Sequence, residues 1–150
     1  MRIPIDHYAS GEHLYNMMAA PVCEKYGLTH MEFTVAMFLA NNTQYDTAAQ
    51  IVKLRRLTKS HVSVSVRSLL QKGLLTGEYR EDNHRTVHLT LTDDAWPIVE
   101  EGRQVQDQFF HALFAGFTED EKKQMMEFMS RIDANIKSGI REEETKNGKE

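Results

Sequence analysis

The chain has 150 residues, which fits one domain or one domain with helices that serve an assembly. Hydrophobic residues make up 41% and charged residues 27%, an ordinary balance for a globular protein that excludes a disordered chain. Residues 1–13 lack the pattern of a signal peptide and no apolar run could cross a bilayer, so we expect a cytoplasmic protein without membrane contact. The single cysteine, Cys23, excludes an intramolecular disulfide and a cysteine-rich metal site.

The net charge of −4 is unevenly distributed along the chain. Residues 47–90 contain eight basic and three acidic side chains, a local charge of +5, so the remainder carries −9. From Thr47 to Leu75 there is no acidic residue. A merely solvated surface would include some Asp or Glu over that length, whereas phosphate binding needs Lys and Arg to displace condensed counterions. The distribution favours nucleic acid as a partner.

Apolar residues at helical spacing predict a first helix over 9–26, in which Pro21 can cause a kink and which Gly27 can end. The next two helices each begin with a capping box, in which a threonine hydroxyl accepts an N–H and the acid or amide three residues later answers it. The boxes Thr29-x-x-Glu32 and Thr47-x-x-Gln50 predict helices over 30–41 and 48–55.

A fourth helix is predicted over 59–73, with Thr58 as its N-cap and Gly73 at its end. Its predicted apolar face comprises Val62, Val66, Leu69 and Leu70. The period then changes from helical to alternating, as in a half-buried hairpin. This predicts strands over 74–80 and 85–92, joined by a turn over 81–84.

Two long helices follow, over 93–116 and 119–139, the second opened by the capping box Thr118-x-x-Glu121. Their apolar residues form a stripe that a small domain cannot cover internally, which predicts association with a second copy of the chain. The stripe comprises Phe109, Leu113, Phe114, Phe117, Met125, Phe128, Met129, Ile132 and Ile136. Residues 141–150 are predicted to be a charged, solvated tail.

The order helix, short helix, turn, helix, hairpin predicts a mainly α fold with a small β-hairpin wing (α+β), a winged helix-turn-helix flanked by dimerisation helices. A recognition helix must pack one face on its own core and present short polar groups and cations to the major groove. The outer face of helix 59–73 is predicted to be centred on Ser60, Val64, Arg67, Ser68 and Gln71. The predicted DNA contacts on this helix are Lys59, Ser60, His61, Ser63, Val64 and Arg67. Four serines (60, 63, 65 and 68) are poor helix formers, and they suit a surface that needs small donors.

These segments resemble the multiple antibiotic resistance regulator (MarR) family over about residues 8–140. The stretch KSHVSVSVRSLLQKGLL (59–75) resembles its recognition helix, TAAQIVKL (47–54) the helix before it, and NHRTVHLTLT (83–92) its wing. Arg85 falls on the arginine that reaches towards the minor groove in the family. Asn83 replaces the family's usual Asp, and the adjacent Asp82 could brace Arg85 instead.

The resemblance implies a homodimer that binds a pseudo-palindromic double-stranded DNA operator and regulates transcription, as a repressor released by a small, often aromatic, effector. One MarR-type domain over 1–150 would contain dimerisation helices at 1–28 and 93–140, a DNA-binding lobe at 29–92 and the tail at 141–150. On the hairpin, the predicted DNA contacts are Arg80, His84 and Arg85. The predicted effector-binding residues are His13, Met17 and Met37.

Catalysis is not expected, because the chain contains no nucleophile elbow, P-loop or H-E-x-x-H motif. Ser63 and Ser65 near His61 lack an orienting acid. We therefore predict no catalytic residue, metal ligand or cofactor. A second alternative is a helical interaction module that keeps the winged scaffold without binding DNA.

A metal- or redox-responsive regulator of the same fold is a further alternative. Residues 91–102 resemble zinc-responsive members of the family, but the His-rich run that follows in those members is missing. Cys23, His30 and His111 are conceivable ligands, although their spacing matches no familiar site. Cys23 as a peroxide sensor is disfavoured by Glu24, which would raise its pKa.

Overall fold

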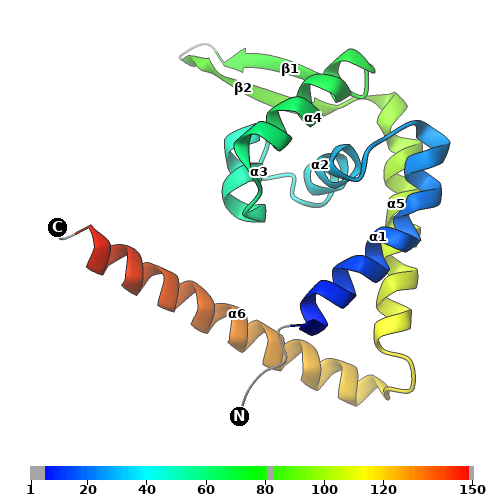
Figure 1. The fold of residues 1–150 in the computed structure, drawn as a ribbon, viewed down its shortest axis with the longest axis vertical. Coiled ribbons are helices and arrows are strands. Elements are labelled where there is room, and N and C mark those ends of the chain that lie inside the picture. The colour runs from blue at the N-terminus through cyan, green and yellow to red at the C-terminus, as the bar shows by residue number, and fades with distance from the viewer. Residues whose placement is uncertain (1–5, 81–82, 149–150) are drawn as a thin grey trace. The chain divides into compact units, whose positions relative to one another are not determined.

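The computed structural model describes residues 6–80 and 83–148, and it confirms a mainly α fold with a small β-hairpin (Figure 1). The elements within these residues are α1 (Asp6–Tyr26), α2 (His30–Asn41), α3 (Ala48–Arg55), α4 (Lys59–Gln71), β1 (Leu75–Arg80), β2 (Asn83–Leu91), a 3₁₀ turn (Asp93–Ala95), α5 (Trp96–Leu113) and α6 (Glu119–Asn147). The chain divides into two compact units, Met1–Phe109 and Phe110–Glu150.

All three predicted capping boxes are present and determine where α2, α3 and α6 begin. In α2, the Thr29 hydroxyl accepts the Glu32 N–H at 3.1 Å, and the Glu32 carboxylate accepts the Thr29 N–H at 2.9 Å. The same reciprocal pairs open α3 at Thr47 and α6 at Thr118. Each box satisfies N–H groups that a first helical turn otherwise leaves without a partner.

The ends of α1 and α4 are set by glycines in the left-handed region. Gly27 has φ +62° and its N–H donates to the Glu24 carbonyl, while Leu28 donates to the Cys23 carbonyl at 2.8 Å. This pair of bonds is a Schellman motif, which needs a left-handed residue that glycine adopts without strain. Gly73, with φ +70°, ends α4 in the same way, and α1 continues through Pro21.

Some predicted boundaries and one predicted capping contact are wrong. Helix α6 runs to Asn147 rather than 139, because ion pairs such as Lys146–Glu143 support its charged end. Thr58 is the N-cap residue of α4, but its side chain makes no capping hydrogen bond. Strand β2 already begins at Asn83, and residues 81–82 of the predicted turn lie outside the described residues.

Helix α2 forms the centre of the first unit, with nearly its whole length buried and contacts to α1, α4 and β2. Gly102 lets α5 approach it closely: a Cβ at this position would collide with the sulfur of Met37 and lie 3.1 Å from the Phe33 ring. Helix α5 also pairs with α1, where the Glu101 carboxylate accepts from both Lys25 and Tyr26.

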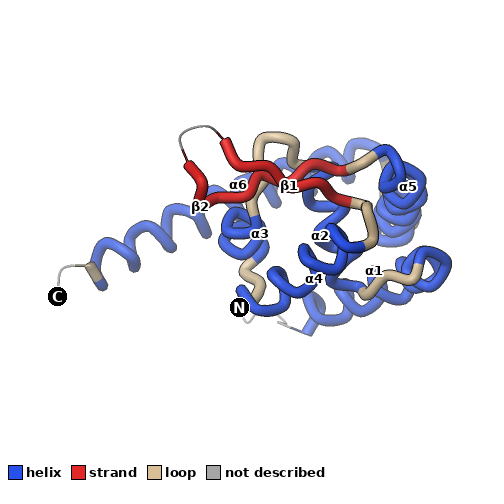
Figure 2. Tube along the Cα trace, turned by 90° about the horizontal axis from the view of Figure 1, so that it is seen from above, coloured by secondary structure: helices blue, strands red, loops and turns tan. Residues whose placement is uncertain are grey.

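The two strands form an antiparallel hairpin that extends beyond the helices supporting it (Figure 2). Leu75 pairs with Leu91 at its base, and a register shift between Tyr79 and Arg80 marks a bulge towards its tip. Among the described helices, none is both long and apolar enough to span a membrane.

Candidate nucleic-acid interface

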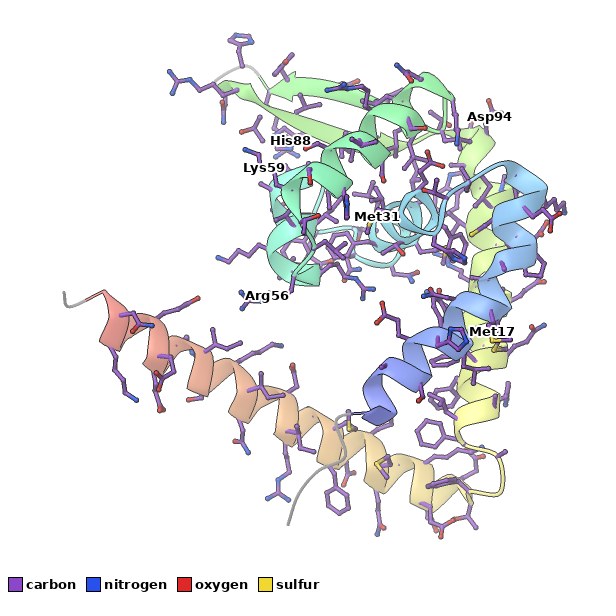
Figure 3. The ribbon with its side chains drawn as sticks, viewed as in Figure 1. Met17, Met31, Arg56, Lys59, His88 and Asp94 are labelled. Atoms are coloured by element: carbon purple, nitrogen blue, oxygen red, sulfur yellow. The ribbon has the colours of Figure 1, made fainter. Side chains whose placement is uncertain are left out.

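The turn between α3 and α4 is short because one residue reverses the chain. Arg56 adopts φ +53°, and both its own N–H and that of Leu57 donate to the Val52 carbonyl. The chain then enters α4 at Lys59. Arg56 and Lys59 lie on the same side of the first unit, and His88 of the hairpin lies above them in the view of Figure 3.

Helix α4 is anchored by an apolar face and presents its other face to solvent. Val62 and Leu69 are fully buried and Val66 nearly so, which fixes how the helix is rotated on α2. All nine predicted DNA contacts are exposed: Lys59, Ser60, His61, Ser63, Val64, Arg67, Arg80, His84 and Arg85. Val64 is 65% exposed on this outer face.

Three side chains of α4 do not lie where the pattern placed them. Ser65 is buried, and Ser68 is half-buried and hydrogen-bonds to Glu32, so neither serine belongs to the outer face. Leu70, expected on the inner face, is 37% exposed. The reason is geometric: with Val62, Val66 and Leu69 inward, the 3.6-residue repeat turns Ser65 inward and Leu70 to the edge.

The basic segment is less positive than its sequence suggests, because two of its eight cations are neutralised from outside it. Lys72 pairs with Glu32 at 2.7 Å, and Arg80 pairs with Asp46 at 2.7 Å. The other six form no ion pair among the described residues: Lys53, Arg55, Arg56, Lys59, Arg67 and Arg85. Within the described residues, the uncompensated positive charge of this segment is therefore carried by these six side chains.

Glu32 connects the start of α2 to the end of α4. Burial would raise the pKa of this carboxyl, but hydrogen bonds from Lys72, Ser68 and the Thr29 N–H outweigh it and lower the pKa below its ordinary value. The Lys72 ammonium also donates to the Gly27 carbonyl at 2.7 Å. This network holds α4 in place from its C-terminal end.

The hairpin tip carries polar side chains ordered by Asn83. Its side-chain oxygen accepts the Arg85 N–H at 2.9 Å, and its amide donates to Thr86 at 3.0 Å. Asn83 thus supplies the side-chain turn that an Asp would supply at this position. The predicted brace from Asp82 to Arg85 lies outside the described residues.

Sequence reasoning did not find Tyr79 or Asp46. Tyr79 is 58% exposed on β1 and its ring lies 6.1 Å from that of His84, so it joins the hairpin surface. An aromatic residue at an alternating strand position beside a turn flanked by Arg80 and Arg85 was the available signal. Asp46 gave no signal, because its partners are 34 and 42 residues away.

A shallow hollow of about 270 Å³ lies between α3, α4 and the hairpin. It is lined by Ala48, Ser63, Val66, Arg67, Leu70, Val87 and Leu89. Two of its lining residues, Ser63 and Arg67, are predicted DNA contacts, and the other lining residues are apolar.

The effector candidates do not come together there. His13 and Met17 are exposed on α1, whereas Met37 is 3% exposed in the core beside Gly102. None of the three lines the hollow beside α4. The effector assignment stays a prediction.

Two of the metal and redox candidates, Cys23 and His30, are neighbours in the first unit. Cys23 is buried, which raises the pKa of its thiol, and its sulfur lies 3.8 Å from Nδ1 of His30. His111 belongs to the second unit. No three metal-ligating side chains gather among the described residues. His61 forms no hydrogen bond with Ser63 or Ser65 in the part of the chain that the structure describes.

Anchored helix, tight turn, outward-facing helix and hairpin define a winged helix-turn-helix protein. Residues 26–85 match the family model of the MarR family, which confirms the resemblance that the sequence indicates. No curated protein matches the chain.

Solved structures share this fold over most of their length. A putative MarR family transcriptional regulator from Listeria monocytogenes, complexed with a 26mer DNA, superimposes with a TM-score of 0.81 at 15% identity, covering 91% of this chain and 90% of its own. A point mutant of MepR from a multidrug-resistant S. aureus clinical isolate gives 0.71 at 20% identity, covering 91% and 99%. An S. aureus MepR–DNA complex gives 0.56 at 21% identity, covering 86% and 96%. At these identities the likeness establishes the fold.

Proposed function

We propose that this protein is a sequence-specific DNA-binding regulator of transcription. The observation that carries the proposal is the outer face of α4. Cations and small polar groups are exposed on this face, while the apolar face of the helix is buried. The similar fold of regulators solved with DNA supports it. Helix α4 would enter the major groove, and Arg85 at the hairpin would reach the minor groove.

The regulator would act as a homodimer on a pseudo-palindromic operator. Helix α6 supports this, because none of its 29 residues is buried although it carries large apolar side chains. A second copy would cover this surface and place two α4 helices about one DNA turn apart. In this proposal residues 29–92 bind DNA, while residues 1–28 and 93–140 dimerise.

Repression and release by a small aromatic effector complete the proposal. Members of the family commonly work in this way, and such a regulator would act on DNA in the cytoplasm. The effector would bind beside α1 in the first unit, where His13 and Met17 are exposed.

A salt titration tests DNA binding without knowledge of the operator. Anisotropy of a labelled random-sequence duplex should show affinity that falls steeply with salt, with a slope of about −0.9 for each phosphate contacted. A protein that binds no duplex even at low salt would instead be the helical interaction module.

Binding-site selection tests the assignment of α4. Variants at Ser60, Val64 or Arg67 should change the selected bases, whereas Lys59→Ala should weaken all sequences alike. If all four variants select the same consensus as the wild type, α4 is not the reading helix.

A further inference from the structure

Asp46 makes an unusual number of contacts for a residue that lies outside the basic segment. It directly precedes Thr47, the N-cap of α3, and its N–H donates to the Gln50 side chain at 3.0 Å. Its carbonyl accepts the Leu89 N–H of β2 at 2.7 Å. The backbone of Asp46 is therefore fixed from both sides, to α3 and to the hairpin.

The carboxylate of Asp46 divides its two oxygens between the two strands. Oδ2 accepts from Nη2 of Arg80 on β1 at 2.7 Å, and Oδ1 lies 2.9 Å from Nδ1 of His88 on β2. The His88 contact needs no charge, because a neutral ring with its proton on Nδ1 donates the same bond. One side chain thus connects both strands to the start of α3.

Arg80 occupies the position where such a brace is most useful. It is the last residue of β1 and stands directly after the register shift at Tyr79, where the regular ladder ends. A two-stranded ribbon is only marginally stable without support. The Asp46–Arg80 bond therefore supports the hairpin beyond its regular pairing, close to Asn83 and Arg85.

We propose that Asp46 is a positioning residue for the wing. In this proposal Arg80 supports the wing through its bond to Asp46 and does not bind a phosphate. This inference rests on the proposed DNA-binding function. If Arg80 left Asp46 to bind a phosphate, the partly buried carboxylate, 29% exposed, would lose its arginine and keep only the His88 contact beside the anionic DNA. That repulsion opposes the exchange. The wing contacts DNA through Arg85, and Arg80 holds the wing in place.

The salt dependence of DNA binding shows whether Arg80 supports the wing or binds a phosphate. Arg80→Gln should leave the slope of log affinity against log salt unchanged, whereas Arg67→Gln, the matched control at an unpaired cation, should make it shallower by about 0.9 for each protomer, or about 1.8 for the dimer. Asp46→Asn should make the slope steeper by about 0.9 for each protomer, or about 1.8 for the dimer, because Arg80 becomes available to a phosphate. The double variant Asp46→Asn/Arg80→Gln should return to the wild-type slope.

Two outcomes overturn the proposal. A slope that becomes shallower in Arg80→Gln alone makes Arg80 a phosphate ligand. An unchanged slope in Asp46→Asn means that the carboxylate does not hold Arg80 away from DNA.

Hydrogen exchange of the free protein tests the brace without DNA. Arg80→Gln and Asp46→Asn should both speed amide exchange in residues 83–91, and Arg67→Gln should not. Equal exchange in all variants contradicts the brace even if DNA binding is confirmed. If the wild-type protein binds no DNA but the variants differ in exchange as predicted, the result contradicts the proposed function and leaves the brace supported.

Discussion

The ammonium of Lys72 lies 2.7 Å from Oε2 of Glu32, so the last turn of the outward-facing helix is tied to the first turn of the central one. The Glu32 side chain is only 5% exposed and caps α2 through Thr29. Its charge therefore serves two helices at once. Loss of Lys72 would leave that carboxylate largely buried without its cation.

Lys72→Met should lower the free energy of unfolding by about 2–4 kcal/mol. Removing one partner of a fully buried pair costs about 3–5 kcal/mol, and the 35% exposure of Lys72 reduces that cost. Urea denaturation followed by circular dichroism measures it. Lys137→Met is the control, because its pair with Asp133 is exposed and should change stability by no more than about 0.5 kcal/mol. Equal losses in both variants would contradict a special role for Glu32.

The lowered pKa of Glu32 predicts a loss of stability in acid. The unfolded-state pKa of a glutamate is about 4.3, and the folded-state value lies below it. The contribution is therefore fully present well above pH 4.3 and disappears as the pH falls through the folded-state pKa. Urea midpoints measured from pH 7 down to pH 3 should fall less steeply for Glu32→Gln than for the wild type. Parallel curves would show that the Glu32 charge does not contribute.

Local signals in the sequence predicted the elements well, because caps and turns are determined by neighbouring residues. Thr47 and Gln50, which are three residues apart, form the capping box that predicts the start of α3. Gly73 ends α4 because its backbone adopts the left-handed conformation. The end of α6 was missed because the predicted helix followed apolar periodicity, whereas charged residues and ion pairs continue it.

The candidate interface was predicted as a list of exposed residues but not as a network. The periodicity of α4 correctly predicts that Ser60 and Arg67 are exposed, because helical geometry alone determines which residues share a face. Whether a basic side chain is free depends on partners far along the chain, such as Asp46 for Arg80. Counting charges within one segment could not show this neutralisation, and it changes which cations would be available to DNA in the proposed function.

Gly102→Ala should destabilise the protein by about 1–3 kcal/mol, because the added methyl group overpacks the contact with Met37 and Phe33. Gly139→Ala is a matched control within α6, where a Cβ meets nothing within 4 Å. That change should be neutral or stabilising by up to about 1 kcal/mol. Thermal unfolding of both variants measures the contrast. A stabilised Gly102→Ala variant would refute the close approach of α5 to α2.

Arg85→Ala should weaken DNA binding by about 1–3 kcal/mol, the range for one lost groove contact, without unfolding the protein. Arg85 is exposed and its backbone N–H is bound by Asn83. Truncating its side chain should therefore remove the DNA contact without changing the conformation of the hairpin. Arg103→Ala, which removes an arginine beside Trp96 on α5, should leave binding unchanged. Anisotropy with a selected duplex compares them. Unchanged binding in Arg85→Ala would refute the wing assignment.

Helix α6 should be an obligatory part of a dimer interface. Its large apolar residues fall on one face, because their spacings of three and four residues follow the helical repeat. The exposed members are Met125, Phe128, Met129, Ile132 and Ile136. Deleting residues 118–150 should leave monomers or aggregates and abolish operator binding, although the basic segment remains intact.

A point substitution on this face gives a sharper test than the deletion. Ile132→Arg places a charge within the apolar stripe, whereas Ser130→Arg introduces the same side chain on the other face of the exposed helix. Burying an unpaired charge is costly, so Ile132→Arg should raise the dimer dissociation constant by at least about 10-fold, or roughly 1.4 kcal/mol. Ser130→Arg should not. Sedimentation velocity over a dilution series measures both constants. An Ile132→Arg variant that dimerises and binds DNA as the wild type does would show that α6 does not hold the dimer together.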